Sequence, residues 1–127
     1  MNLLYEYAVV RVIPRVELEE FINVGVILFC KKSGFLDCRI FFDEKKILCL
    51  DPEADIEMIS ENIDAFNHIA SGSKCNSTIA KLPAPERFRW LTAVRSTIIQ
   101  CSKVHPGFTH DEKAQLERLF SQFVKRH

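Results

Sequence analysis

The segment that most constrains the fold runs from Glu19 to Phe29, with the sequence EEFINVGVILF. Its content of Ile, Val, Leu and Phe is typical of a strand, but Asn23 and Gly25 interrupt the apolar run two positions apart. Strict alternation places both on one face with Ile27, while the opposite face is wholly apolar. We therefore predict a strand with one uniformly apolar face and one face that carries two unusual residues.

Two explanations of these residues are open. In the structural one, Asn23 satisfies the backbone of the 15–20 connection and Gly25 accommodates a bulge or a neighbouring aromatic ring. In the functional one, Asn23 orients a ligand and Gly25 lets that ligand approach the backbone. Arg11 and Arg15 then lie nearby and suit a phosphate or a carboxylate. Residue chemistry alone favours the structural explanation, because strand glycines commonly have packing reasons.

The rest of the chain predicts an α+β fold in one domain, residues 1–127. Strand-forming runs cover 5–13, 21–31, 35–42 and 96–104, and helical patterns cover 43–50, 51–71, 83–93 and the chain after 109. Because strands come first and helices follow, we expect an antiparallel sheet of about four strands. Helices are expected on one face of this sheet, ending with an amphipathic C-terminal helix.

Local signals set the expected ends of these elements. Asp51 and Pro52 place a capping carboxylate and a first-turn proline at the start of the second helix. Thr109 and Glu112 match a capping box before the last helix. The 106–107 Pro-Gly pair predicts a turn ahead of that helix.

Composition excludes several classes of protein. Seventeen basic residues balance seventeen acidic ones, which argues against a nonspecific nucleic-acid binder. The five cysteines form no C-x-x-C pair, so neither a disulfide framework nor a thiolate zinc site is indicated. The N-terminus lacks a positively charged leader, and the longest apolar run, 24–30, is too short to span a bilayer. We expect a cytoplasmic protein that is not in a membrane.

Catalytic and metal motifs are weak. Ser96 and His105 have the chemistry of a nucleophile and its base, but no elbow motif surrounds the serine. As metal ligands, Cys101, His105, His110 and Asp111 match no zinc spacing, and no phosphate-binding loop occurs. The sequence thus predicts no metal and no cofactor, and it leaves enzymatic activity open.

A second candidate surface lies on the third predicted helix. On this helix Arg87 and Arg89 do not share a face with Phe88 and Leu91, and Trp90 follows Arg89 in the sequence. Arginine and tryptophan often carry the binding energy of protein interfaces, so this segment is a candidate partner surface. The alternative is that Trp90 belongs to the core and the arginines are ordinary surface residues.

Two blocks of the chain resemble a known family. YEYAVVRVIPRVELEEFINVGVILF and RFRWLTAVRSTIIQCSKVHPGFTHDEKAQLERLF are similar to the small bacterial proteins catalogued as domain of unknown function three-zero-three-seven. The blocks cover the first quarter and the last third of the chain. The matching polar, proline and glycine positions are Arg11, Pro14, Arg15, Glu20, Asn23, Gly25, Arg95, Ser96, His105 and Gly107.

The resemblance implies a cytoplasmic bacterial protein without an assigned activity. Members of this family are often encoded beside toxin-type serine/threonine kinases, which implies a regulatory or accessory partner. Our first hypothesis is therefore a protein-binding or regulatory module, with a kinase as one candidate partner. It uses the polar strand face together with the segment 87–95. Homodimerisation is a further alternative, since an open sheet leaves edges to cover.

The second hypothesis is a small enzyme or a domain that binds a phosphorylated compound or nucleotide. In it Arg11, Arg15 and Arg95 hold the anion, Asn23 orients it and His105 transfers a proton. Both hypotheses require residues from the two family blocks to converge. The candidate site comprises Arg11, Arg15, Glu20, Asn23, Gly25, Arg95, Ser96 and His105.

Overall fold

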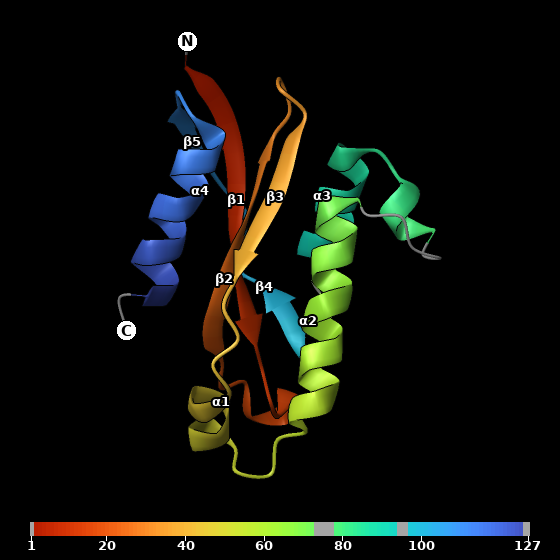
Figure 1. Cartoon of the computed structure of the whole chain (residues 1–127), viewed down its shortest axis with the longest axis vertical. Coiled ribbons are helices and arrows are strands. Elements are labelled where there is room, and N and C mark those ends of the chain that lie inside the picture. Colours follow the sequence, from red (N-terminus) through yellow and green to blue (C-terminus); the bar gives the residue numbers. More distant parts are fainter. Residues whose placement is uncertain (1, 73–77, 94–96, 126–127) are drawn as a thin grey trace.

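The computed structural model describes residues 2–72, 78–93 and 97–125, and within them it shows a five-stranded antiparallel sheet (Figure 1). The strands are β1 (Leu3–Val12), β2 (Ile22–Cys30), β3 (Phe35–Ile40), β4 (Ile99–Cys101) and β5 (His105–Thr109). Their order is β3-β2-β1-β4, and β5 also pairs with β1, along its residues 3–7, whereas β4 pairs with its residues 10–12. The α+β fold is confirmed.

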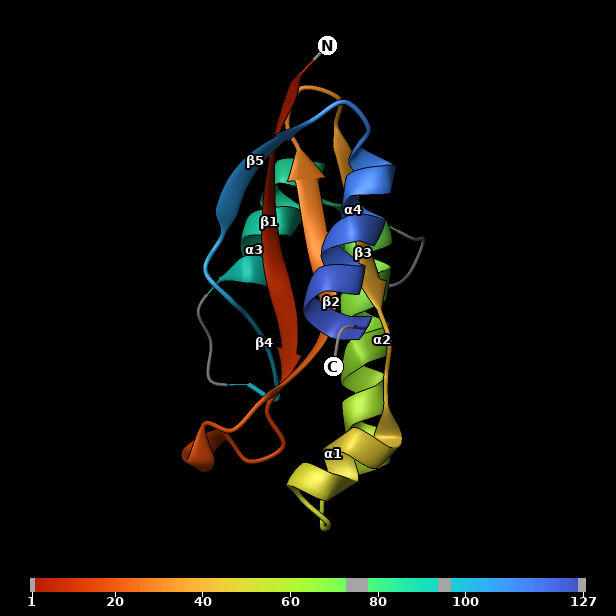
Figure 2. The same cartoon turned by 90° about the vertical axis from the view of Figure 1, so that its left-hand side faces the viewer.

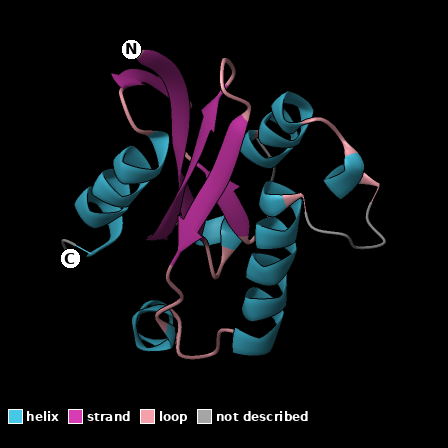
Figure 3. Ribbon diagram, turned by 45° about the horizontal axis from the view of Figure 1, so that its top comes forward, coloured by secondary structure: helices cyan, strands magenta, loops and turns pink. Residues whose placement is uncertain are grey.

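Helices lie on both faces of the sheet, whereas the sequence predicted one face only (Figure 3). They are α1 (Glu44–Leu50), α2 (Ile56–Ser71), α3 (Ala84–Thr92) and α4 (Glu112–Phe120), with short 3-10 turns at Val16–Leu18 and Ile79–Lys81. A π-helical turn, Ser121–Lys125, continues α4 to the end of the described chain. Helices pack on both faces of the sheet because both faces of the central strands are apolar and must be buried.

The two cores have different sizes. The larger one joins the sheet to α2 and α3 and includes Val10, Val12, Ile59 and Phe88. In it the rings of Phe88 and Phe29 stack, with their centroids 5.3 Å apart. The smaller one joins the other face to α4, whose Leu116 and Leu119 are buried against the sheet. Burial of these side chains supplies the main driving force for folding.

A β-bulge divides β2 into two parts. Val10 pairs with Gly25 but Arg11 pairs with Asn23, so Val24 is an extra residue. The carbonyl of Val24 accepts a hydrogen bond of 2.7 Å from the amide of Phe41, which satisfies the extra peptide group. The bulge reverses the alternation: Val24 faces the larger core and Val26, two residues on, faces the smaller one. The strict alternation that we expected over 21–30 is therefore wrong.

Gly25 has a packing reason. A Cβ atom there would lie 2.5 Å from the carbonyl oxygen of Arg39 and 2.7 Å from Cγ1 of Ile40, on the neighbouring strand β3. A glycine at the bulge lets β2 and β3 approach this closely. This geometry is the one that the structural explanation of Gly25 expects.

Two helices begin later than their sequence signals suggest. Asp55, not Asp51, caps α2, and its carboxylate accepts the amide of Met58 at 3.1 Å. Asp111, not Thr109, caps α4 and accepts the amide of Ala114 at 3.1 Å. Two candidate caps precede each helix, and the tertiary contacts of Asp51 leave it unavailable as a cap.

The Pro-Gly pair lies in a strand rather than in a turn. Gly107 of β5 pairs with Tyr5, and a Cβ atom on this glycine would be 2.5 Å from the Tyr5 ring. Pro106 is accommodated because β5 is an edge strand, where a missing amide hydrogen does not break the ladder. β4 spans only Ile99–Cys101, whereas we predicted a strand over 96–104. Residue 96 lies outside the described residues.

No helix in the described part of the chain is long and apolar enough to cross a membrane.

The bulge predicts a specific cost for Gly25→Ala. Because the added methyl group meets the backbone of β3, we expect the free energy of unfolding to fall by about 1–3 kcal/mol. Urea denaturation followed by circular dichroism measures it. The control is Gly34→Asn, since Gly34 has a φ of +75° with open space around it and asparagine tolerates that conformation. Equal stability of Gly25→Ala and wild type would contradict the close approach of β3 to the bulge at Gly25.

Candidate functional site

The structure separates the predicted site residues into three places. Arg11 and Asn23 are cross-strand neighbours on β1 and β2. Arg15 and Glu20 line a pocket after β1. His105 lies on β5 beside Tyr7. Arg95 and Ser96 lie outside the described residues, so the proposed contacts of these two are not addressed. The described residues of the candidate site therefore do not share one cleft.

Arg11 and Asn23 form a polar pair beside Phe21. The guanidinium carbon of Arg11 lies 4.2 Å from the centroid of the Phe21 ring, a cation–π contact. Nδ2 of Asn23 donates a hydrogen bond of 3.3 Å to the carbonyl of Phe123 in the C-terminal π-helical turn. Nε of Arg11 and Oδ1 of Asn23 are both buried and have no hydrogen-bond partner among the described residues. Asn23 thus anchors the C-terminal turn, not the 15–20 connection.

The groove that borders this pair has a volume of about 560 Å³. It lies between the start of β2, α1 and the end of the C-terminal helix, which stops partway along the sheet (Figure 2). We call it the β2–α1 groove; its lining residues are Phe21, Ile22, Asn23, Lys45, Lys46, Cys49, Leu50 and Val124. The lining is mostly apolar and contains two lysines but no carboxylate.

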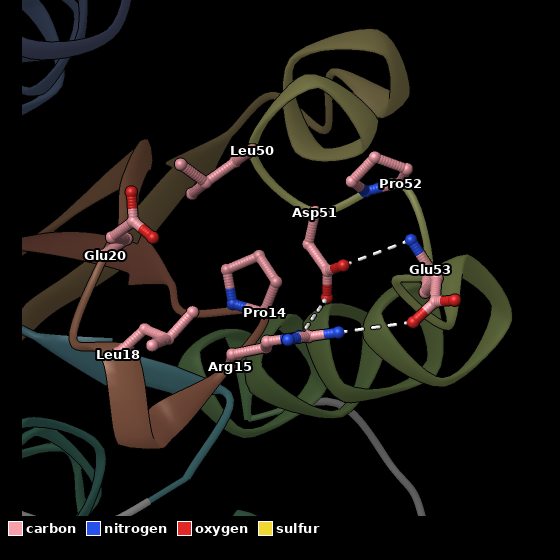
Figure 4. Close-up of a pocket in the computed structure, with 8 residues that line it drawn as sticks. All are labelled: Pro14, Arg15, Leu18, Glu20, Leu50, Asp51, Pro52 and Glu53. Carbon is pink, nitrogen blue, oxygen red and sulfur yellow. Dashed lines mark hydrogen bonds and ion pairs between the residues drawn. The ribbon is translucent and has the colours of Figure 1, made fainter.

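A second pocket, of about 340 Å³, has the opposite charge (Figure 4). Arg15 lies at its wall, where Nε is 3.4 Å from the carboxylate of Asp51 and Nη2 is 3.2 Å from that of Glu53. Glu20 adds a third carboxylate to the lining. Leu50 lines both pockets, so the two are neighbours. Because the carboxylates already neutralise Arg15, this pocket does not suit a phosphate.

His105 is remote from both pockets. Its ring lies 5.5 Å from that of Tyr7, which in turn lies 6.0 Å from the ring of Phe123. Burial, and then the nearby Tyr5, raise the pKa of Tyr7 above its ordinary value. Tyr7 and Arg11 are four residues apart on β1, about 13 Å along a strand. The histidine is therefore not placed to transfer a proton to an anion held at Arg11.

Arg87 has a structural role. Its guanidinium donates to the carbonyls of Ile69 and Ala70 at 3.0 and 2.9 Å, and to that of Leu82 at 2.9 Å. The first two carbonyls belong to the last turn of α2, whose carbonyls lie past the helical amides, and that of Ile69 also accepts the amide of Gly72 at 3.2 Å. Arg87 therefore closes the C-terminus of α2 rather than facing a partner. Trp90 is 39% exposed and is not fully in the core.

Thiol and metal chemistry find no support among the described residues. Cys38 donates a hydrogen bond of 2.9 Å to Oδ1 of Asn67. Burial, with smaller effects from Asp37 and Cys101, raises the pKa of Cys38 to about 12, so its thiol stays protonated at neutral pH. In the described part of the chain no three His, Cys, Asp or Glu side chains cluster as metal ligands.

A family profile described as "protein of unknown function (DUF3037)" matches residues 7–124. The chain belongs to the DUF3037 family. Comparisons with curated proteins and with solved structures found no significant match. The match covers nearly all of both blocks that carry the resemblance and also the middle of this DUF3037 chain.

Sequence reasoning missed most of the lining of the β2–α1 groove in this DUF3037 domain. Lys45, Lys46 and Cys49 come from α1, which carried no recognisable motif, and Val124 comes from the C-terminal turn. The one available signal was Phe21, a large aromatic residue at the start of a strand that has a polar neighbour at Asn23. Only the tertiary fold brings β2, α1 and the chain end together.

The contacts of Arg87 predict a large effect on stability. Arg87→Ala leaves three carbonyls without a charged donor, and we expect a loss of about 2–4 kcal/mol in the free energy of unfolding. Thermal and urea denaturation measure the loss. The matched control is Arg89→Ala, at an exposed position two residues on, with an expected change within about 0.5 kcal/mol. An Arg87→Ala variant as stable as this control would refute the capping role.

Proposed function

We propose that this DUF3037 chain is a protein-binding module that holds a segment of a partner protein in the β2–α1 groove. The observation that carries the proposal is the lining of that groove: an apolar surface with two exposed lysines and no carboxylate. Phe21, 46% exposed, provides an aromatic contact at its edge. Exposed apolar surface rimmed by charge is typical of interaction sites.

The alternative, an enzyme or binder of phosphorylated compounds, has less support. It needs Arg11, Arg15 and His105 around one anion, yet Arg15 is paired with Asp51 and Glu53 in the other pocket. His105 lies beside Tyr7, on β5. Arg11 is not among the residues that line the groove, although its guanidinium contacts Phe21, which is. A protein segment requires no such convergence of catalytic groups.

The partner is expected in the same reducing compartment. The described cysteines at positions 30, 38, 49 and 101 are free thiols, which is consistent with a cytoplasmic location. A toxin-type kinase, the partner that the family resemblance suggests, is one candidate source of the segment. A second copy of this chain is the other, because β3 and β5 leave sheet edges unpaired among the described residues.

Selection of binding peptides tests the proposal even though the partner is unidentified. Random 16-residue peptides displayed on phage are panned against the wild-type protein, and enriched peptides are synthesised for fluorescence polarisation. We expect the double variant Lys45→Glu/Lys46→Glu to weaken binding at least tenfold, since it reverses the charge of the groove. The charge-matched control is Lys81→Glu/Lys113→Glu, at exposed positions that do not line the groove.

Backbone amide chemical shifts then locate the bound peptide. We expect the largest changes at residues that line the groove. A selection that enriches no peptide, or peptides whose binding the two double variants affect equally, would overturn the proposal.

A further inference from the structure

Two pockets of opposite charge lie side by side at one end of the molecule. Leu50 lines both of them. On one side of it lies the acidic pocket, which Arg15 shares with three carboxylates, and on the other side lies the β2–α1 groove with Lys45 and Lys46. A surface with a negative half beside a positive half is complementary to itself after a half-turn about an axis between the halves. Here that axis would pass close to Leu50.

The connection between β1 and β2, residues 16–20, supplies exposed charge to the negative half. Three of its five side chains are exposed carboxylates: Glu17, Glu19 and Glu20. Leu18, which lies among them, is 53% exposed. The amide of Leu18 donates to the carbonyl of Arg15 at 3.1 Å, and the next amide donates to that of Val16 at 3.2 Å. Because these hydrogen bonds preform the turn, it loses little conformational entropy on docking.

The 16–20 connection is held at a fixed place relative to the groove. It lies at the same end of the molecule as α1 (Figures 1 and 2). The ion pairs of Arg15 with Asp51 and Glu53, at 3.4 and 3.2 Å, tie the connection to the chain that directly follows α1. One half-turn can therefore place the connection of each copy on the groove of the other at the same time, as a closed two-fold dimer requires.

We propose that the protein forms a two-fold dimer in which the 16–20 connection of each copy docks in the β2–α1 groove of the other. This inference rests on the proposed function and names the partner of that groove: a second copy of this chain. Leu18 of one copy contacts the apolar lining of the other's groove. The glutamates beside it face the other copy's Lys45 and Lys46.

Charge complementarity favours this occupant. The lining of the groove has two lysines and no carboxylate, and the 16–20 connection has three carboxylates and no basic residue. The whole chain has seventeen basic and seventeen acidic residues, so two copies carry no net charge that would keep them apart. Docking also covers Leu18 and Phe21, two large apolar side chains that are 53% and 46% exposed in the single chain.

A charge swap tests the pairing in solution. The variant Lys45→Glu/Lys46→Glu places like charges at both contacts of a homodimer, and so does Glu17→Lys/Glu19→Lys. We expect the wild type to sediment as a dimer at micromolar concentration in analytical ultracentrifugation. Each double variant alone should have a dissociation constant at least tenfold higher.

Mixing the two double variants is the decisive step. We expect an equimolar mixture to form heterodimers, because both contacts of the mixed dimer again join opposite charges. A chain that carries all four substitutions should dimerise on its own for the same reason. Double variants that are monomeric alone and remain monomeric when mixed would overturn the inference.

Matched controls separate the contact from folding. Leu18→Ser should weaken the dimer at least tenfold, whereas Leu4→Ser should change its dissociation constant less than twofold. Leu4 is 54% exposed, as Leu18 is 53% exposed, but it lies on β1 and lines neither pocket. Thermal unfolding confirms that each variant is folded. If one charge variant is unfolded, Leu18→Ser and the other charge variant decide the question.

Three further outcomes distinguish this inference from the proposed function. Groove-binding peptides from the selection above should dissociate the dimer, because they take the place of the connection. Peptides that bind the groove and leave a dimer intact would overturn the inference alone. A wild type that stays monomeric, or a dimer that no groove or connection variant weakens, would also overturn it, and the peptide selection would still decide the proposed function.

Discussion

The β-bulge at Val24 is the constraint on which the rest of the structure depends. It adds one residue to β2 opposite β1, so that the strand presents Val24 to the larger core and Val26 to the smaller one. Without it, regular alternation would place Val24 on the same face as Val26, away from the larger core. Gly25 makes the bulge compatible with β3, whose backbone lies where a side chain would begin. The same bulge aligns Asn23 with Arg11 and turns its amide toward Phe123.

The groove that we propose as a docking site follows from this alignment. Asn23 fastens the C-terminal turn to the sheet, and that turn supplies Val124 to one wall of the β2–α1 groove. α1 supplies the opposite wall, and its last residue, Leu50, separates the groove from the acidic pocket around Arg15. The two neighbouring pockets differ in charge, since carboxylates line the one around Arg15 and lysines line the β2–α1 groove.

Much of the fold was predictable from local patterns. The strands at β1–β3, the helices α1 and α3, the buried stripe of α2 and the C-terminal helix follow from periodicity and composition. The site was less predictable, because a bulge changes the facing of every residue on one side of it and leaves no fixed sequence signature. Asn23 and Gly25 were recognisable as unusual, but their partners, Phe123 and Arg39, are distant in the sequence. The separation of Arg15 from Arg11 depends on Asp51, which the helix-cap pattern assigned elsewhere.

The central claim is that the bulge at Val24 sets the register of β1 against β2. Cross-strand nuclear Overhauser effects between the two strands measure this register directly. The account predicts contacts of Val10 with Gly25 and of Arg11 with Asn23, with Val24 skipped, and contacts from the Asn23 side-chain amide to Phe123. Contacts of Arg11 with Val24 and of Val12 with Asn23 would show a regular ladder and contradict the account.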